Sequence, residues 1–327
     1  MVRGGMTPDA TTLRALRQAD ASLPASELAA LAGLPLAELN ASLDRLTEAG
    51  FDIERHPSRG CRLLASPDRL LADDLHARLG EGCALAREIL VYEETSSTND
   101  VASRLGRAGH AGGVAIFAER QTAGRGRFGR RWDSADHAGL WFSLLLRPAW
   151  PMIRWPRLTT WAGVGVAAVV ETFAGTPARL KWPNDVLLAN RKVAGILIES
   201  ATDDQGTPFA VAGIGVNVNQ SEFPPEIADR AASISQIAGH PVDRPALAAA
   251  LLRELERRLP DAAHGSTLIA EAADRSALLG NWIRLQAGST VVEGTAEALD
   301  EEGNLILRLA DGTTYRATAG EVTSQIS

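Results

Sequence analysis

Apolar residues in the first 65 positions recur at helical spacing and then give way to two short β-type runs. Helices are expected at residues 13–19 and, with Ser26 as N-cap, up to Gly33. Runs 51–54 and 60–64 would form a hairpin, so residues 1–66 are predicted to be a winged helix-turn-helix domain. Between the second helix and the hairpin, a third helix that ends at Gly50 carries an apolar stripe at steps of three and four, formed by Leu36, Leu39, Leu43 and Leu46.

The pattern changes at about residue 84, where apolar runs of strand length alternate with longer helical segments. This order predicts a mixed β-sheet with helices over residues 67–275. Short β-type runs separated by turns follow, and they predict a small SH3-like barrel over residues 276–327. The chain is therefore expected to be a multidomain α+β protein. In the central domain, strands are expected at residues 89–92, 114–118, 140–146, 179–182, 193–200 and 209–218, and helices at 97–106, 155–173 and 245–259.

The composition of the chain argues against several classes of function. The 327 residues are 45% hydrophobic and 22% charged, with a net charge of −7, so no global basic field attracts nucleic acid or anionic membrane. Cys61 and Cys83 form no CxxC pair, which fits a reducing compartment. Residues 1–5 lead into no apolar segment, and the apolar stretch at 157–171 is too short for a bilayer, so we expect a cytoplasmic protein without signal peptide or membrane span. The histidines show no metal-ligand spacing, and no structural metal is expected.

The densest chemical signal directly follows the strand expected at 114–118. Three glycines alternate with four arginines there, in Gln121-Thr122-Ala123-Gly124-Arg125-Gly126-Arg127-Phe128-Gly129-Arg130-Arg131-Trp132. Glycines let backbone N–H groups approach an anion, and arginines supply permanent planar donors. When ATP activates a carboxylate, each like-charge pair near 4 Å costs about 4 kcal/mol at an effective dielectric of about 20. A mobile loop of this kind beside one lysine would supply the required cations and exclude water.

Two other interpretations of this segment compete. The string from Gly124 to Gly129 fits the GxGxxG pattern of dinucleotide-binding folds, which would make the protein a nicotinamide oxidoreductase. That fold needs an apolar helix at once, with an acidic residue about 20 positions further on. Arginines, Trp132 and Asp133 follow instead, so the match is weak. The second alternative is a solvated basic loop, in contact with RNA or with no ligand.

Four further polar islands flank expected strands. Each one alone is compatible with an ordinary turn or helix cap. They are Ser96-Ser97-Thr98-Asn99, Lys181-Trp182-Pro183-Asn184-Asp185, Arg191-Lys192-Val193-Ala194-Gly195-Ile196-Leu197-Ile198-Glu199 and Gly213-Ile214-Gly215-Val216-Asn217.

In this order and at this spacing, the islands and the glycine–arginine segment resemble the biotin–protein ligases. With the N-terminal domain included, the resemblance is to the two-function members of that family, which are also biotin operon repressors. It extends over nearly the whole chain, since Gly294-Thr295-Ala296 and Gly320-Glu321-Val322 are similar to the family's small C-terminal barrel. The central domain would then have the fold shared by biotin and lipoate ligases and class II synthetases. Phe128 departs from the pattern, because a basic residue often stands there.

The resemblance also implies a role for each motif residue. Arg125, Arg127 and Lys192 become the candidate catalytic residues. Lys192 would neutralise the reacting carboxylate and α-phosphate, and the two arginines would fold over the bound acid and the adenylate phosphate. Gly195 and Gly213 would let the ligand approach the backbone. The residues expected to line the biotin pocket or fold over the bound acid are Ser97, Thr98, Asn99, Gln121, Gly124, Arg125, Gly126, Arg127, Lys192, Gly195 and Gly213. Those expected to face ATP and its Mg²⁺ are Arg127, Trp132, Asn184, Asp185, Lys192 and Asn217.

The implied reaction has two steps. The biotin carboxylate displaces pyrophosphate from MgATP, and a lysine of the biotin carboxyl carrier protein then attacks the biotinyl adenylate, releasing AMP. The sequence offers no clear general base for that lysine. A lipoate–protein ligase and a ligand-sensing transcription factor without turnover remain the alternatives.

DNA binding by the N-terminal domain is an open question at this point. The third helix carries several acidic residues against a single arginine, whereas phosphate contacts need cations. A domain that only packs against the ligase or a partner is the alternative. The resemblance further implies a homodimer in the liganded state. The candidates for contact with operator DNA are Arg45, Arg55, Arg59 and Arg62.

Overall fold

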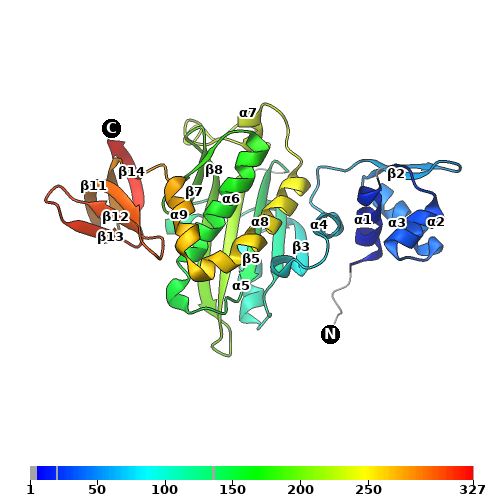
Figure 1. Cartoon of the computed structure of the whole chain (residues 1–327), viewed down its shortest axis with the longest axis horizontal. Helices are drawn as coiled ribbons and strands as arrows, with labels where there is room; N and C mark the ends of the chain where they lie inside the picture. The colour runs from blue at the N-terminus through cyan, green and yellow to red at the C-terminus, as the bar shows by residue number, and fades with distance from the viewer. Residues whose placement is uncertain (1–5, 20, 135–136, 327) are drawn as a thin grey trace.

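The computed structural model describes residues 6–19, 21–134 and 137–326, which form three bodies along the longest axis of the molecule (Figure 1). Residues 1–5, on which the expectation of no signal peptide partly rests, lie outside the described residues. Three helices and an antiparallel hairpin make up the N-terminal body, as predicted for a winged helix-turn-helix. They are α1 (Pro8–Gln18), α2 (Ala25–Ala32), α3 (Leu36–Glu48), β1 (Asp52–His56) and β2 (Gly60–Ala65).

Local chemistry sets the ends of the first two helices. The Thr7 hydroxyl accepts a hydrogen bond from the N–H of Ala10 at 3.1 Å, so α1 begins five residues before the predicted start at 13. Ser26 lies within the first turn of α2 and caps nothing, so the predicted N-cap is wrong. Gly33 ends α2 with a φ of 66°, as predicted, because a left-handed residue closes the last turn.

The apolar stripe of α3 is confirmed at three of its four positions. Leu39, Leu43 and Leu46 are buried, whereas Leu36 is 48% exposed at the first position of the helix. Periodicity alone cannot tell whether the first turn of a helix lies over the core or beyond its edge.

The central body contains a seven-stranded mixed sheet in the order β3-β4-β5-β9-β8-β7-β6. The pair β3–β4 is parallel, and the other neighbouring pairs are antiparallel. The sequence did not predict β7, which is a four-residue strand after the Pro-Asn-Asp corner. The strands are β3 (Glu88–Thr95), β4 (Val114–Gln121), β5 (Gly139–Leu146), β6 (Ala178–Lys181), β7 (Asp185–Leu188), β8 (Arg191–Thr202) and β9 (Pro208–Asn217).

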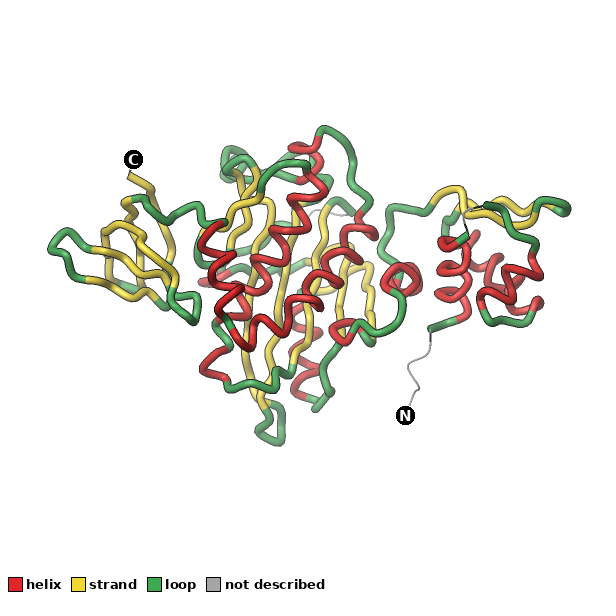
Figure 2. Tube along the Cα trace, viewed as in Figure 1, coloured by secondary structure: helices red, strands yellow, loops and turns green. Residues whose placement is uncertain are grey.

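Helices cover the two faces of this sheet unequally. Strand β4 alternates: Phe117 faces the large core under α6 and α8, while Ile116 faces Val101 of α5 on the other side. Figure 2 shows the long helices lying in front of the sheet. The α5 face is covered only in part, which leaves room for a ligand. The helices are α4 (Ala72–Leu79), α5 (Thr98–Arg107), α6 (Arg157–Ala174), α7 (Ile234–Ala238), α8 (Arg244–His264) and α9 (Ser266–Asp274), with 3₁₀ turns at Ala84–Ala86, Arg127–Gly129 and Met152–Arg154.

The C-terminal body is a five-stranded antiparallel sheet in the order β13-β12-β11-β10-β14, with its own core around Ile283, Leu285 and Leu307. It matches the predicted small β domain. The boundaries expected at residues 66 and 275 fall between β2 and α4 and between α9 and β10. No described helix has the length and apolarity that a membrane crossing requires. The strands are β10 (Trp282–Ala287), β11 (Thr290–Leu299), β12 (Leu305–Arg308), β13 (Thr314–Ala317) and β14 (Glu321–Ile326).

A buried ion pair fixes the linker between the first two bodies to the central sheet. Arg244 and Glu119 are 0% and 1% exposed, and Arg244 Nη1 lies 2.6 Å from Glu119 Oε2. The other Glu119 oxygen accepts the N–H of Leu70 at 2.8 Å, and Arg244 Nη2 donates to the carbonyl of Asp68 at 2.8 Å. Because Glu119 lies on β4, two residues before Gln121, the linker is anchored beside the candidate site.

Candidate active site

A cavity of about 640 Å³ opens on the α5 face of the central sheet. Its size lies within the range of small-molecule sites. It is bounded by the start of α5, by strands β8 and β9, by the loop 121–132 and by the C-terminal body. It brings together every ligand residue that the sequence predicted except Gly124, namely Ser97, Thr98, Asn99, Gln121, Arg125, Gly126, Arg127, Trp132, Asn184, Asp185, Lys192, Gly195, Gly213 and Asn217.

A pair of glycines makes a flat patch on the floor of the cavity. Gly195 on β8 and Gly215 on β9 are cross-strand neighbours. A Cβ on either one would lie 2.7 Å from an atom of the Trp132 ring, so side chains there would displace the indole. Trp132 also meets Trp141 edge to face, with ring centroids 6.1 Å apart. The indole is thereby fixed as an aromatic wall. Its N–H has no hydrogen-bond partner among the described residues.

Residues of strands β5, β8 and β9 hold the side chain of Asn99 in place. A Cβ on Gly213 would lie 2.2 Å from Asn99 Oδ1, so glycine makes room for that side chain. The Ser143 hydroxyl approaches Asn99 Oδ1 to 2.6 Å, and Asn99 Nδ2 donates to Glu199 Oε2 at 2.6 Å. Asn99 is 4% exposed. A buried amide held on both sides has a fixed orientation, which favours a ligand with directional hydrogen bonds.

Thr98 and Gln121 form the rest of this end of the cavity. The N–H and the hydroxyl of Thr98 donate to Gln121 Oε1 at 2.8 and 3.2 Å, and Gln121 Nε2 donates to the Ser134 hydroxyl at 3.2 Å. Ser97, the residue before α5, is 3% exposed. Neutral amides and hydroxyls therefore dominate here, and they suit an uncharged polar ligand group.

The segment 121–132, which we call the glycine–arginine loop, is a tight ribbon. The N–H of Trp132 donates to the carbonyl of Gly124 at 2.9 Å, and the N–H of Gly126 donates to that of Arg130 at 2.7 Å. A single 3₁₀ turn forms its tip, where Phe128 has a φ of 58° and is 65% exposed. No apolar helix follows, in agreement with the weak match to a dinucleotide-binding fold.

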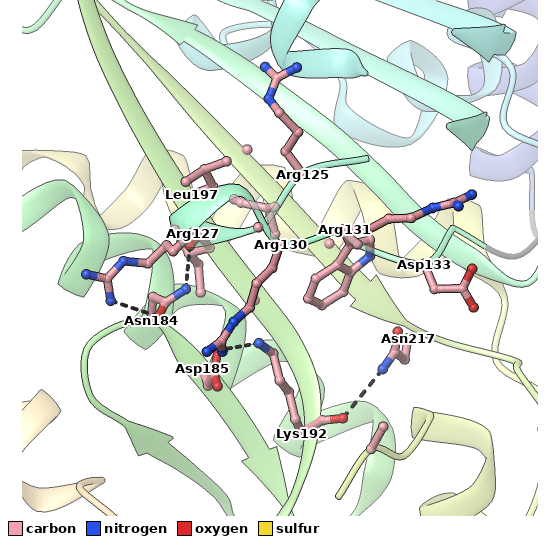
Figure 3. A pocket seen from close by; sticks show the side chains of 18 of the residues that line it. Arg125, Arg127, Arg130, Arg131, Asp133, Asn184, Asp185, Lys192, Leu197 and Asn217 are labelled. Atoms are coloured by element: carbon pink, nitrogen blue, oxygen red, sulfur yellow. Dashed lines mark hydrogen bonds and ion pairs between the residues drawn. The ribbon is translucent and has the colours of Figure 1, made fainter. Parts of the chain in front are cut away.

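The opposite end of the cavity is cationic. Arg127 Nη1 donates to the carbonyl of Gly320 at 3.2 Å, and Arg130 Nη1 donates to Glu321 Oε1 at 2.7 Å. Lys192 Nζ lies 2.5 Å from Asp185 Oδ1 and 5.2 Å from the centroid of the Trp132 ring. Figure 3 shows the side chains of Arg127, Arg130 and Lys192 on the Asn184–Asp185 side of the cavity. This end suits an anionic ligand group, such as a phosphate or a carboxylate.

Comparisons with known proteins agree with this geometry. The profile of the Biotin/lipoate A/B protein ligase family matches residues 91–219, and that of the Biotin protein ligase C terminal domain matches residues 278–323. The bifunctional ligase/repressor BirA of Bacillus subtilis is 35% identical over 275 residues, which cover 83% of this chain and 84% of that protein. The chain belongs to the biotin/lipoate A/B protein ligase family.

Other members of the ligase family cover most of the chain. A biotin--[acetyl-CoA-carboxylase] ligase of Mycobacterium tuberculosis is 37% identical over 262 residues, which cover 78% of this chain and 94% of that one. Among solved structures, a biotin protein ligase from Aquifex aeolicus in complex with biotin and ATP superposes with a TM-score of 0.63 at 31% identity. That alignment covers 73% of this chain and 98% of the other.

The structure shows contacts within this ligase-family chain at five of the predicted ligand residues, whose ligand roles stay predictions. Gly124 does not line the cavity, because its Cα faces the carbonyl of Trp132, where a Cβ would lie 2.8 Å away. Gly195 and Gly213, which are expected to let a ligand approach the backbone, both line the cavity and also make room for the Trp132 ring and for Asn99. The Asn217 amide donates to the carbonyls of Ala232 and Lys192 at 3.2 and 3.4 Å, so it holds a loop.

The fifth of these residues is Arg125. Its Nη1 lies 2.7 Å from Asp100 Oδ1, and its Nη2 lies 3.6 Å from Glu199 Oε2. Its side chain points away from Arg127, Arg130 and Lys192 (Figure 3). Arg125 lines the cavity, but it does not stand among the cations at the far end.

Several contributors were missed from the sequence. Ser143, which is fully buried, was read only as part of an apolar strand. Glu321 was noted for its motif, yet its pairing with the glycine–arginine loop joins residues 191 positions apart. The sequence did contain a signal for Ser143, because this residue carries the only hydroxyl in the otherwise apolar run of β5. No local signal could have found the pairing of Glu321.

Before a nucleotide binds, the protein side chains around the cavity provide few groups that could hold a metal ion. Within the described ranges, no three His, Cys, Asp or Glu side chains gather closely enough for this. Mg²⁺ in nucleotide sites is commonly held by one or two carboxylates together with phosphates and water. Asp185, which lines the cavity beside Lys192, fits the role of such a carboxylate.

The arginines predicted to contact DNA are mostly paired within the N-terminal body. Arg45 Nη2 lies 2.7 Å from Asp9, Arg55 lies 2.6 Å from Asp44, and Arg59 lies 2.8 Å from Glu54. Hydrogen bonding to Asp9 and Glu38 raises the pKa of Arg45. Arg62 is exposed and lines a separate groove between the N-terminal and central bodies. DNA phosphates would have to compete with these carboxylates.

Proposed function

We propose that the protein is an ATP-dependent biotin–protein ligase, which makes biotinyl-5′-AMP and transfers biotin to a lysine of a biotin carboxyl carrier protein. One observation carries the proposal: a single cavity joins a neutral, hydrogen-bonding end around Thr98, Asn99 and Gln121 to a cationic end around Arg127 and Lys192. An acid with an uncharged polar head and a carboxylate tail that meets ATP needs these two environments side by side.

The residues divide the work of adenylation between them. Asn99 and Gln121 would hold the ureido ring, because both amides are fixed by hydrogen bonds. Lys192 and Arg127 would reduce the repulsion between the incoming carboxylate and the α-phosphate. Trp132 would pack against the nucleotide and offer its free N–H. Mg²⁺ bound with ATP would screen the phosphate charge, and Asp185 would contribute to holding it.

Transfer needs an acceptor lysine but little further activation, since the acyl adenylate is a mixed anhydride. The glycine–arginine loop lies over the cavity and would shield the intermediate from water until the carrier docks. A protein that uses ATP and a carboxylase subunit is expected in the cytoplasm.

Pyrophosphate exchange into ATP tests the first step. Purified full-length protein should exchange pyrophosphate in the presence of biotin and not in the presence of lipoate. Exchange with lipoate alone would identify a lipoate ligase. Biotin binding without exchange with either acid would indicate a sensor without turnover. Incorporation of labelled biotin into a carrier domain, and its loss when the acceptor lysine is replaced by arginine, tests the second step.

A second role, as a biotin-responsive repressor, is supported by the N-terminal helices and hairpin and by the similarity to the bifunctional ligase/repressor BirA of Bacillus subtilis. We propose that this body binds operator DNA as part of a homodimer formed in the liganded state. Gel shifts with DNA from upstream of biotin-synthesis genes, at low and moderate salt, test the first point. Sedimentation with and without biotin and ATP tests the second. Absence of salt-dependent binding would leave the N-terminal body as a packing domain.

A further inference from the structure

The base of the glycine–arginine loop is held by two carboxylates that the proposed chemistry does not use. Asp100 lies in the first turn of α5, and Glu199 lies on β8. Both meet the guanidinium of Arg125, at 2.7 Å from Nη1 and at 3.6 Å from Nη2. One arginine therefore connects the loop to a helix and to a strand of the sheet.

Each carboxylate is itself held by a second polar group. The Ser96 hydroxyl donates to Asp100 Oδ2 at 2.8 Å, and the carbonyl of Ser96 accepts the N–H of Ala123 in the loop at 2.8 Å. Glu199 Oε2 accepts the Asn99 amide at 2.6 Å. The same acid thus orients a pocket amide and the loop arginine. A displacement of the loop base would therefore change the position of Glu199 and the orientation of the Asn99 amide.

The charge states agree with a permanent contact. Burial raises the pKa of Asp100, but hydrogen bonds from Arg125 and Ser96 outweigh this and hold the pKa below its usual value. Burial lowers the pKa of Arg125, and the bonds to Asp100 and Glu199 more than compensate. At neutral pH the two groups are oppositely charged. Their side chains are 32% and 37% exposed, so salt can reach the pair.

We infer that Asp100 and Glu199 are positioning residues, which hold Arg125 and the loop base over the biotin end of the cavity and thereby slow the escape of the acyl adenylate. The inference rests on the proposed function. In the competing role, Arg125 itself binds the phosphate of the ligand, and its pairing with the two carboxylates keeps the guanidinium away from that phosphate. The two roles predict opposite effects when the carboxylates are removed.

The test compares Asp100→Asn, Glu199→Gln and the double variant in the full-length protein. The matched control is Glu297→Gln, an exposed carboxylate in the C-terminal sheet that pairs with Arg308 at 2.9 Å, away from the cavity. Two quantities are measured: kcat and KM for biotin-dependent pyrophosphate exchange, and the release rate of preformed labelled biotinyl adenylate in a chase with unlabelled biotin and ATP.

We expect release to accelerate about tenfold in Asp100→Asn and further in the double variant. For Asp100→Asn, kcat for exchange should change by less than about threefold, because Asp100 holds the loop base and is not among the groups proposed to bind biotin or ATP. Raising the salt concentration should speed release from the wild type but not from the double variant, a response that a general packing defect would not remove. The control should match the wild type in both assays.

Two outcomes would overturn the inference. Unchanged release from a double variant that still exchanges pyrophosphate would show that the carboxylates do not hold the loop. A lower KM for ATP in that variant would show that Arg125 is a ligand residue which the acids restrain. A wild-type protein that exchanges no pyrophosphate with biotin would refute the proposed function, and the inference with it.

Discussion

Replacing Lys192 by alanine tests the electrostatic argument most directly. The backbone of Lys192 is anchored without its side chain, because its N–H donates to the carbonyl of Arg230 at 2.7 Å and its carbonyl accepts the N–H of Ala232 at 3.0 Å. The side chain is 33% exposed, and its ammonium pairs with Asp185. The variant should therefore fold, while the cavity loses one fixed positive charge.

The size of the effect follows from Coulomb's law. A unit charge about 4 Å from the developing charge, at an effective dielectric of about 20, contributes about 4 kcal/mol. Since about 1.4 kcal/mol corresponds to a factor of ten in rate, Lys192→Ala should slow adenylate formation by about a thousandfold. Part of that loss comes from Asp185, which is left facing the phosphates.

Single-turnover formation of labelled biotinyl adenylate, with thermal unfolding as the check on folding, measures this effect. Lys192→Arg serves as the matched control, because it keeps the charge while changing the geometry. Turnover of Lys192→Ala within about fivefold of wild type would mean that other cations stabilise the transition state, and the role given to Lys192 would be wrong.

Three other substitutions address the loop, the floor and the linker. Arg127→Gly should raise the release of adenylate into solution more than it slows synthesis, as measured by a chase; equal retention would refute this. Gly213→Ala would place a Cβ 2.2 Å from Asn99 Oδ1 and should raise the KM for biotin at least about tenfold in exchange assays; an unchanged KM would show that Asn99 does not bind biotin. Arg244→Met removes the arginine partner of the buried Glu119 carboxylate. This should lower the free energy of unfolding, measured in urea, by about 3–5 kcal/mol, and most of the loss should be absent once Glu119→Gln is also present.

The sequence predicted the chemistry of the site better than its geometry. Glycines beside arginines, and polar residues at strand ends, indicated an anion site, and all but one of the predicted ligand residues line one cavity. Such signals are local, because each depends on a few adjacent residues. Long apolar runs such as β5 were equally clear, since burial on both faces leaves little ambiguity.

What the sequence could not supply are contacts between distant segments. The two acids on Arg125 come from residue 100, in α5, and residue 199, on β8. Gly215 was part of a predicted motif. Its packing against the Trp132 ring, however, depends on the strand register that places Gly215 opposite Gly195. Register and side-chain pairing across a sheet are set by the whole fold. Strand β7 was missed for a local reason, because it begins at Asp185, the last residue of a Pro-Asn-Asp sequence that is typical of a turn.

Two of the three cations at the Asn184–Asp185 end of the cavity are already paired with carboxylates. Lys192 is paired with Asp185 and Arg130 with Glu321, so an arriving phosphate competes with a resident carboxylate instead of meeting a bare cation. Arg127 differs. Its partners are the carbonyl of Gly320, the amide oxygen of Asn184 and the ring of Phe128, and within the described ranges no carboxylate lies at ion-pair distance from it. Burial lowers the pKa of Arg127, although Asp185 and Glu321 oppose this from further away. A half-buried cation with only neutral partners gains most from an incoming anion, so we expect the environment of Arg127 to change most when the adenylate forms.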